Sequence, residues 1–291
     1  MLDRLYPTQM LYPFTKMHGI GNDFVVFDSF SQSVNLSREQ VRHIADRQFG
    51  IGCDQVLLLE PSQSDDADVR YRIFNADGGE VMQCGNGARC AAVYLKEKGL
   101  VDKSEVVAET GAGNLVLHIN DDGRVTVNMG VPEFEPAKIP MQTDEYTEQY
   151  NLILEESPLQ GEDEITFGAV SMGNPHAVII VDDVDIAPVS VLGPALQLNA
   201  LFPDSVNVGF MQILNKKAFK LRVYERGSGE TLACGSGACA AMVIACQQGY
   251  LEGTIDAELR GGHLTLSWAG DGEPVYMTGP ATTVFEGKVE L

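Results

Sequence analysis

Apolar and polar side chains alternate along two stretches of the chain that lie 150 positions apart. Residues 69–73 alternate three apolar side chains with two basic ones, and residues 219–223 do the same. A period of two is typical of a strand with one buried face. Each stretch runs into a glycine-rich turn and then an alanine-rich run that ends at Gly99 or Gly249. Because glycine commonly follows the last turn of a helix, the pattern predicts a strand, a turn and a helix twice.

The two stretches belong to one internal repeat. Between residues 69–99 and 219–249, ten of the 31 pairs at the constant offset of 150 are identical, and no gap is needed. Self-similarity at a fixed offset indicates a duplicated structural unit. The chain is therefore expected to contain two similar halves that meet near residue 130.

Weaker echoes support the duplication at an offset of 152. They pair Asn22 with Asn174 and Gln55 with Asn207. Elsewhere strands dominate, and we expect each half to be a curved sheet wrapped around one helix of small residues, an α/β (α+β) arrangement.

Turn signals mark two further hairpins and one irregular segment. Asp121–Gly123 separates two alternating runs, and residues 262–279 carry a second hairpin pattern. Residues 141–165 are acidic and irregular, so we expect them to be a surface excursion of the second half.

Charge and composition narrow the classes of function. The chain has 291 residues, a hydrophobic fraction of 44% and a formal net charge of −21. A surface this acidic repels phosphate backbones and anionic lipid, so neither nucleic acid nor a membrane is expected as a partner. There is no apolar run long enough to span a bilayer and no apolar signal-peptide core at the N-terminus, so we expect a cytoplasmic protein with reduced thiols.

Two of the six cysteines occupy equivalent places in the repeat. Cys84 and Cys234 are each followed by Gly-x-Gly-Ala, at or just before the start of a predicted helix. The unpaired amides and the dipole of a helix N-terminus favour a thiolate, so the pKa of both thiols is expected to fall. The same amides can hold a carboxylate.

A pair of such thiols suits a reaction that is symmetrical about one carbon. If the repeat brings both to one cleft, a thiolate on one face removes a proton and a thiol on the other face supplies one, which inverts a stereocentre. Two rival interpretations remain. The cysteines are inert buried thiols, or Cys84 with Cys90 and Cys234 with Cys239 are metal-ligand pairs. Their spacing differs from the two-residue spacing of zinc knuckles, and we expect no metal.

Seven blocks together make the chain resemble the diaminopimelate epimerase family from about Met10 to Leu291. The blocks are KMHGIGNDF, GCDQ, FNADGGEVMQCGNGARC, SMGNPHAV, VNVGF, YERGSGETLACGSGACA and MTGPATTVFEG. Residues 1–9 lie outside the pattern. The resemblance implies a cofactor-independent isomerase, an epimerase that interconverts LL- and meso-2,6-diaminoheptanedioate in lysine and peptidoglycan precursor biosynthesis.

The resemblance also implies the site. Cys84 and Cys234 would be the catalytic acid and base, and His176 and Glu225 would modulate their pKa values. The substrate diaminopimelate would be bound by Asn22, Gln55, Asn75, Gly85, Asn86, Asn174, Asn207, Glu225, Arg226, Gly235 and Ser236.

The implied fold has two pseudo-symmetric halves. They would comprise residues 1–130 with the strand 280–291 returning to them, and residues 131–279, with the active site in the cleft between the halves. A homodimer is expected. Two other functions stay open: a related two-cysteine racemase like the proline racemases, and a non-catalytic module that binds amino acids or anions at the helix ends.

Overall fold

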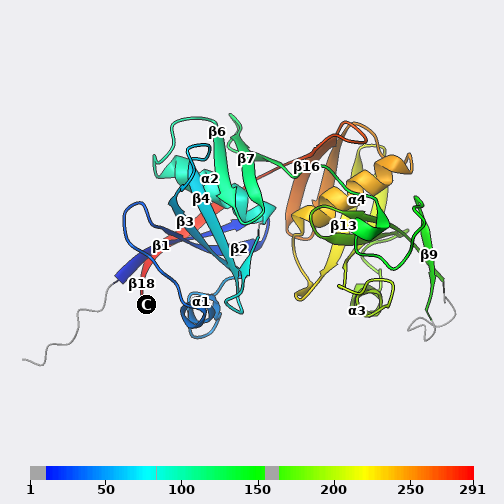
Figure 1. Ribbon diagram of the computed structural model, residues 1–291, viewed down its shortest axis with the longest axis horizontal. Coiled ribbons are helices and arrows are strands. Elements are labelled where there is room, and N and C mark those ends of the chain that lie inside the picture. Colours follow the sequence, from blue (N-terminus) through cyan, green and yellow to red (C-terminus); the bar gives the residue numbers. More distant parts are fainter. Residues whose placement is uncertain (1–10, 83, 155–163) are drawn as a thin grey trace, which may run out of the picture. The chain divides into compact units, whose positions relative to one another are not determined.

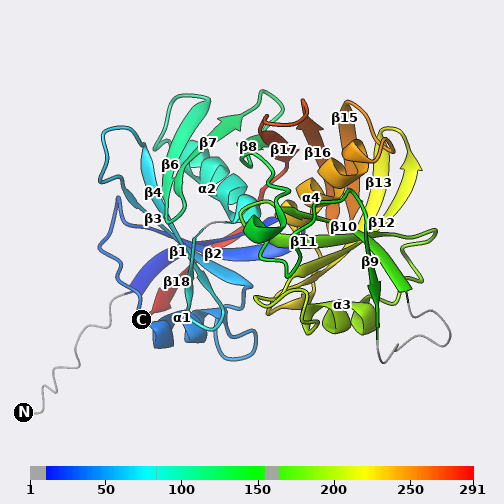
Figure 2. The same ribbon diagram turned by 45° about the vertical axis from the view of Figure 1, so that its right-hand side comes forward.

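The computed structural model describes residues 11–82, 84–154 and 164–291. Residues 1–9, which lie outside the family pattern, are also outside the described residues. The chain divides into two compact units (Figures 1 and 2): residues 1–125 with 280–291, and residues 126–279.

The first unit is built on an open mixed sheet. β2 pairs with β3 and β4 with β6 in parallel, and the other neighbours are antiparallel. In order of pairing the strands are β18 (Thr282–Glu290), β1 (Leu11–Gly19), β2 (Asn22–Asp28), β3 (Gln55–Pro61), β4 (Val69–Asn75), β6 (Glu105–Thr110) and β7 (Gly113–Ile119), and the short β5 (Glu80–Val81) also lies on β4.

Helix α2 (Gly85–Glu97) forms the centre of this unit and contacts β1, β2, β3, β4, β7 and β18. Its Ala88, Ala91 and Ala92 side chains are fully buried, and their small size lets the strands approach the helix closely. A second helix, α1 (Arg38–Ala45), begins at a capping box made by Ser37 and Gln40 and buries its apolar face in a separate cluster of the core.

The second unit repeats this plan. The pairs β11–β12 and β13–β15 are parallel, as are their counterparts β2–β3 and β4–β6. In order of pairing the strands are β9 (Tyr150–Ile153), β10 (Glu164–Ser171), β11 (Pro175–Ile180), β12 (Asn207–Asn215), β13 (Ala218–Glu225), β15 (Thr254–Leu259), β16 (Gly262–Trp268), β17 (Val275–Gly279) and β8 (Val125–Asn128), and β14 (Gly229–Glu230) lies on β13.

Helices α3 (Val189–Gln197) and α4 (Gly235–Gln247) take the places of α1 and α2, and a short 3-10 helix, η1 (Pro136–Lys138), precedes β9. The outer strand of the first sheet comes from the end of the other half of the sequence, because β18 follows the second repeat and pairs with β1. In the second sheet, β9 belongs to the second unit itself and pairs with β10, the next strand along the chain.

The predicted elements of the repeat are confirmed. The two alternating stretches are β4 and β13, and the alanine-rich runs are α2 and α4. Gly99 and Gly249 follow their helices with φ of 65° and 73°, a backbone region that favours glycine. The mixed, mostly antiparallel sheets with few helices confirm the α+β fold.

The hairpin in residues 262–279 is confirmed by the antiparallel pairing of β16 with β17. The turn at Asp121–Gly123 also forms, with the Gly123 amide donating to the carbonyl of Asn120 at 2.9 Å, but β8 beyond it pairs with β17.

The prediction that residues 141–165 are an irregular surface excursion is partly wrong. Residues 150–153 form β9 on β10, and Met141, Tyr150 and Leu154 are buried in the core of the second unit. Apolar side chains scattered among acidic ones have no periodicity that reveals this. Residues 155–163 of that segment lie outside the described part of the chain.

Candidate active site

Cys84 is the N-cap residue of α2, with extended φ and ψ of −149° and 119°. Its carbonyl accepts hydrogen bonds from the Tyr71 hydroxyl at 3.0 Å and from the Ala88 amide at 2.9 Å. Its sulfur donates to the side-chain oxygen of Asn22 at 3.8 Å. A side chain at position 87 would meet the Tyr71 hydroxyl at 2.7 Å, so glycine is required for this close approach.

Two amides and an arginine form a chain of hydrogen bonds beside Cys84. The guanidinium of Arg89 donates from Nη2 to Oδ1 of Asn86 at 2.9 Å, and Asn86 donates from Nδ2 to Oδ1 of Asn22 at 3.2 Å. Asn22 in turn donates from Nδ2 to Oδ2 of Asp54 at 3.0 Å. Arg89 is fully buried, and Asn86 is only 3% exposed.

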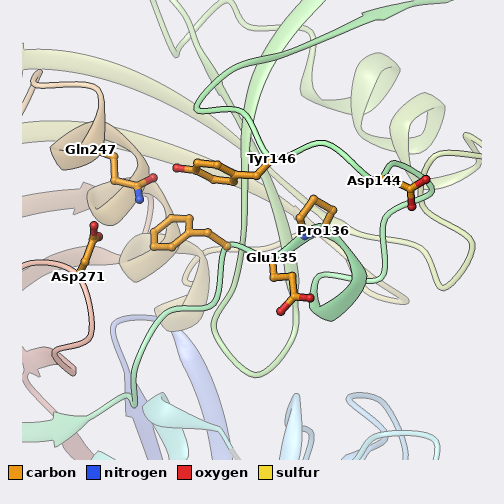
Figure 3. Close-up of a pocket in the computed structure, with 7 residues that line it drawn as sticks. Glu135, Pro136, Asp144, Tyr146, Gln247 and Asp271 are labelled. Atoms are coloured by element: carbon orange, nitrogen blue, oxygen red, sulfur yellow. The ribbon is translucent and has the colours of Figure 1, made fainter.

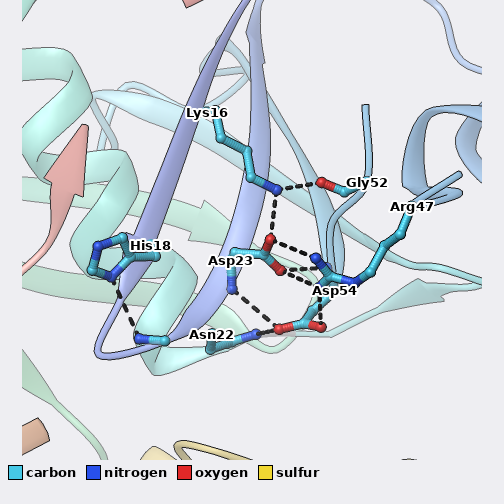
Figure 4. A network of polar contacts seen from close by, with 8 residues as sticks. Lys16, His18, Asn22, Asp23, Arg47, Gly52 and Asp54 are labelled. Carbon is cyan, nitrogen blue, oxygen red and sulfur yellow. Dashed lines mark hydrogen bonds and ion pairs between the residues drawn. The ribbon is translucent and has the colours of Figure 1, made fainter. Parts of the chain in front are cut away.

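Asp54 belongs to a charged cluster at the start of β2 and β3 (Figure 4). Arg47 forms ion pairs with Asp23 at 2.7 Å and with Asp54 at 2.8 Å, and Lys16 pairs with Asp23 at 2.6 Å. These cations lower the pKa of Asp23 to about 2 although burial acts in the opposite direction. The cluster fixes the backbone around Asn22, because the amides of Asp23 and Asp54 also donate to its carboxylates.

Gln55 and Asn75 lie opposite each other on β3 and β4 of the same unit. Nε2 of Gln55 donates to Oδ1 of Asn75 at 2.8 Å. The amide NH₂ group of Gln55 has a second proton that can be donated to a ligand.

Cys234 is the N-cap of α4 and is 4% exposed. Its sulfur accepts from the Gly237 amide at 3.3 Å and lies 3.7 Å from the Ser236 hydroxyl. It also hydrogen-bonds to the carboxylate of Glu225, which in addition accepts from the Thr231 hydroxyl.

His176 reaches Cys234 only through two other side chains. Nε2 of His176 lies 3.0 Å from Oδ1 of Asn174, and Nδ2 of Asn174 donates to the Ser236 hydroxyl at 3.4 Å. Burial and the charge of Arg226 lower the pKa of His176 to about 3, so the imidazole is neutral. Because an amide oxygen can only accept, the neutral ring donates from Nε2.

Asn207 and Arg226 are connected through the backbone. Asn207 is 3% exposed and donates to the carbonyl of Pro175 at 2.9 Å, while its oxygen accepts from the Arg226 amide at 2.9 Å. The guanidinium of Arg226 is held by the carbonyl of Asp204 at 2.9 Å. A guanidinium has further N–H groups that can bind a planar anion.

The expectation of a lowered pKa is wrong for Cys234. Burial raises the pKa of this thiol well above its usual range, and the Glu225 carboxylate raises it further. The hydrogen bonds from Ser236 and Gly237 act in the opposite direction and are outweighed. The sequence places the sulfur at a helix start, but it does not show how completely the surrounding strands exclude water from it.

Each unit thus brings one cysteine together with its own group of predicted residues. The first group contains Asn22 and Asn86 around Cys84, with Gly85 as the first residue of α2. The second group contains Asn174, Ser236 and Glu225 around Cys234, with Gly235 as the first residue of α4.

Sequence reasoning missed Asp54, Arg89 and Tyr71. One signal was available for Arg89, because it is the single charged residue of 84–95, a stretch with the alanine pattern of a buried helix. Such a charge requires partners inside the protein. Asp54 and Tyr71 carry no comparable signal.

Two of the other cysteines have the properties of inert core residues. Cys90 and Cys53 are buried, and burial raises the pKa of each to about 12. Among the described residues no group of three or more His, Cys, Asp or Glu side chains is arranged to hold a metal ion.

A hollow of about 430 Å³ in the second unit contains none of the predicted site residues (Figure 3). It is lined by Phe134, Glu135, Pro136, Asp144, Tyr146, Gln247 and Asp271. No helix in the described part of the chain is long and apolar enough to cross a membrane.

Known proteins resemble this chain over nearly its whole length. The family model for diaminopimelate epimerase matches residues 14–135 and 168–284. The diaminopimelate epimerase of Teredinibacter turnerae is 53% identical over 278 residues, which cover 96% of this chain and 99% of the relative. That of an Azoarcus species is 54% identical over 279 residues, or 96% and 98% of the two chains.

Solved structures share the fold at much lower identity. A PhzF-family phenazine biosynthesis protein from Bacillus anthracis matches with a TM-score of 0.70 and 16% identity, covering 97% of this chain and all of the other. A hydroxyproline epimerase from Agrobacterium vitis with bound trans-4-hydroxy-L-proline matches with a TM-score of 0.66 and 18% identity, over 98% and 94% of the chains. These likenesses support the two-unit α+β architecture.

Proposed function

Because this chain belongs to the diaminopimelate epimerase family, we propose that it interconverts LL- and meso-2,6-diaminoheptanedioate, with Cys84 and Cys234 as the two catalytic groups. The observation that carries the proposal is the repetition of one local structure. Each unit has a cysteine as the N-cap of its central helix, followed by glycine at the first helical position.

The reaction requires no cofactor in this scheme. The thiolate of one cysteine takes the proton from the α-carbon, so that an S–H bond forms, the C–H bond breaks and the electron pair passes to the carbon and its carboxylate. The thiol of the other cysteine then gives its proton to the opposite face, and the configuration is inverted. This step requires the two cysteines to face one cleft between the units, which is part of the proposal.

The charge that develops on the carboxylate would be stabilised by the first amides of α2 and α4. Donors fixed before the reaction stabilise such charge more effectively than water does. Gly85, Asn86, Gly235 and Ser236 would supply these donors.

The surroundings of Cys234 suit a group that changes its protonation state. Its thiol donates to Glu225, which can take the proton when Cys234 acts as the base. The Gly237 amide at 3.3 Å and the Ser236 hydroxyl at 3.7 Å would then stabilise the thiolate. Neutral His176 would act on this thiol through Asn174 and Ser236.

The distal end of the substrate carries a second carboxylate and a second ammonium group. We assign the carboxylate to the guanidinium of Arg226, which can bind it in a bidentate manner. The amides of Asn22, Gln55, Asn75, Asn174 and Asn207 would complete the pocket, and Glu225 would accept from an ammonium group.

The decisive experiment is incubation with LL-diaminopimelate in heavy water without added cofactor. Deuterium at the α-carbon of the meso product supports the proposal. Cys84→Ala and Cys234→Ala should each abolish turnover while circular dichroism stays unchanged, and Cys246→Ala, at the far end of α4, is the matched control. Turnover of proline but not of diaminopimelate would favour the racemase alternative, and binding without exchange would favour the binding module.

We also propose a homodimer in the cytoplasm. The dimer is supported by β18, which has β1 as its partner among the described strands and exposes Val284 and Phe285 at 55% and 47%. Sedimentation equilibrium tests it. The compartment is supported by the chemistry, because two catalytic thiols must stay reduced.

A further inference from the structure

The two repeats contain equivalent asparagines whose side chains are anchored by different groups. Asn22 and Asn174 correspond at the offset of 152, and they lie at the starts of equivalent parallel pairs, Asn22 as the first residue of β2 and Asn174 directly before β11. Asn22 is anchored by Asp54, and Asn174 by His176. At the same offset Asp54 corresponds to Val206 and His176 to Phe24, so each anchor exists in only one repeat.

The chain through Asn22 has a fixed polarity because its two ends are a cation and an anion. Arg89 can only donate a hydrogen bond, and the Asp54 carboxylate can only accept one. The amides of Asn86 and Asn22 between them must therefore accept on the side of Arg89 and donate on the side of Asp54, as they do at 2.9, 3.2 and 3.0 Å. This polarity turns the oxygen of Asn22 toward the sulfur of Cys84.

The chain through Asn174 has the reverse polarity. His176 donates to the oxygen of Asn174, so the NH₂ group points to Ser236. Since the Ser236 oxygen accepts that bond, its own proton is available to the sulfur of Cys234. Through its asparagine, one repeat thus directs an acceptor at its thiol, and the other directs a donor.

We propose that Asp54, together with Arg89, is a positioning residue that holds the oxygen of Asn22 toward Cys84. An oxygen facing the sulfur favours the thiol over the thiolate, whereas the Ser236 donor acts in the opposite direction at Cys234, where the Glu225 carboxylate is the acceptor instead. The two thiols of a symmetrical reaction therefore have unequal surroundings built into the repeat. The inference rests on the proposed roles of the two cysteines, but it can be tested without measuring turnover.

The other charged groups of this region do not replace Asp54 as the anchor. The side chains of Arg47 and Lys16 bind the carboxylates of Asp23 and Asp54, whereas Asp54 is the carboxylate that accepts from the side chain of Asn22. Tyr71 and Cys90 also lie close enough to interact with the charge of Cys84, and burial raises the pKa of both.

The test measures the pH dependence of Cys84 alkylation by iodoacetamide, resolved by peptide mass spectrometry. The reagent attacks the thiolate, so the midpoint of the rate profile reports the ionisation of this one sulfur. Asp54→Val introduces the residue of the equivalent position in the other repeat. It should lower the midpoint by about one pH unit, since only the bond from Asn86 then holds the oxygen of Asn22, and the NH₂ group, without its acceptor, can reach the sulfur.

Three matched variants distinguish the hydrogen bond between Asn22 and Asp54 from the charge of Asp54 as the cause of the shift. Asp54→Asn removes the charge but keeps an acceptor for Asn22, so it should keep the wild-type midpoint. Arg47→Gln removes the ion pairs but leaves Oδ2 of Asp54 in place, and it should also behave like the wild type. Asn22→Ala removes the oxygen itself and should lower the midpoint at least as much as Asp54→Val.

Several results would overturn the inference. A wild-type midpoint in Asp54→Val or in Asn22→Ala means that the oxygen is not held at the sulfur by Asp54. An equal shift in Asp54→Asn or Arg47→Gln assigns the effect to charge alone. If Asp54→Val does not fold, Asn22→Ala and Asp54→Asn decide the question. Turnover retained in Cys84→Ala would refute the proposed function, whereas a wild-type alkylation profile in Asp54→Val would refute only the positioning role.

Discussion

Burial of His176 should make the second unit lose stability in mild acid. The folded protein keeps this imidazole neutral because its pKa is lowered from 6.5 to about 3. In the unfolded chain the same group takes up a proton below its ordinary pKa of 6.5. The unfolded state therefore binds more protons, and the free energy of unfolding falls as the pH drops from 6.5 toward 3.

The size of this loss follows from the lowered pKa. Each pH unit below the ordinary pKa lowers the free energy of unfolding by about 1.4 kcal/mol, so at about pH 5 it has fallen by about 2 kcal/mol. Carboxylates with lowered pKa values, such as Asp23 and Glu80, lose their contributions mainly below their ordinary values of 3.8 and 4.5. The interval between about pH 7 and pH 5 thus isolates the histidine.

Urea unfolding followed by the fluorescence of Trp268 measures the effect in the right place, since the single tryptophan lies in the same unit as His176. His176→Gln, which keeps a donor for Asn174 but does not titrate, should lose about 2 kcal/mol less than the wild type between the two pH values. His263→Gln, on an exposed part of β16, is the control: it shows how much the pH dependence of the free energy of unfolding changes when an exposed histidine is lost. An equal pH difference in the wild type and His176→Gln would refute the argument.

Three further predictions concern single contacts. Arg89→Met leaves the buried oxygens of Asn86 and Pro280 without their donor, so it should lower the free energy of unfolding in urea by about 2 to 6 kcal/mol. The control Arg70→Met, at a half-buried arginine, should lower it by less than about 1 kcal/mol, and equal losses would contradict the role of Arg89. Gly237→Ala brings a methyl group to 3.1 Å from the sulfur of Cys234 and should lower kcat roughly tenfold with little change in Tm, and an unchanged kcat would mean that the sulfur is not held in place by this turn. Arg226→Met should raise KM for diaminopimelate roughly ten- to a hundredfold through the loss of a charged hydrogen-bond donor, and unchanged kinetics would remove this residue from the pocket.

The sequence predicted the parts of the fold that depend on local pattern. Alternation identified β4 and β13, the alanine runs identified α2 and α4, and the glycines marked the helix ends. These features succeed because backbone geometry alone fixes the spacing of buried positions in strands and helices. The equivalence of Asn22 with Asn174 was likewise predicted from a few identical neighbours.

The sequence did not predict features that depend on packing in three dimensions. A helix start suggested a lowered pKa for Cys234, yet the strands around it exclude water and reverse the direction. The link from Asp54 to Asn22 spans 32 positions and appears only when β2 and β3 lie side by side. Tyr150 is buried because β9 pairs with β10, and the hydrophobic pattern of the sequence does not indicate this pairing.

The return of β18 to the first sheet has a consequence for the origin of the molecule. β18 completes the sheet of the first repeat although it follows the second repeat in the sequence. A protein with one copy of the repeat would leave its first strand without an outer neighbour unless two molecules exchanged their final strands. Duplication within one gene turns that exchange between molecules into an exchange within a single chain, which no dilution can separate.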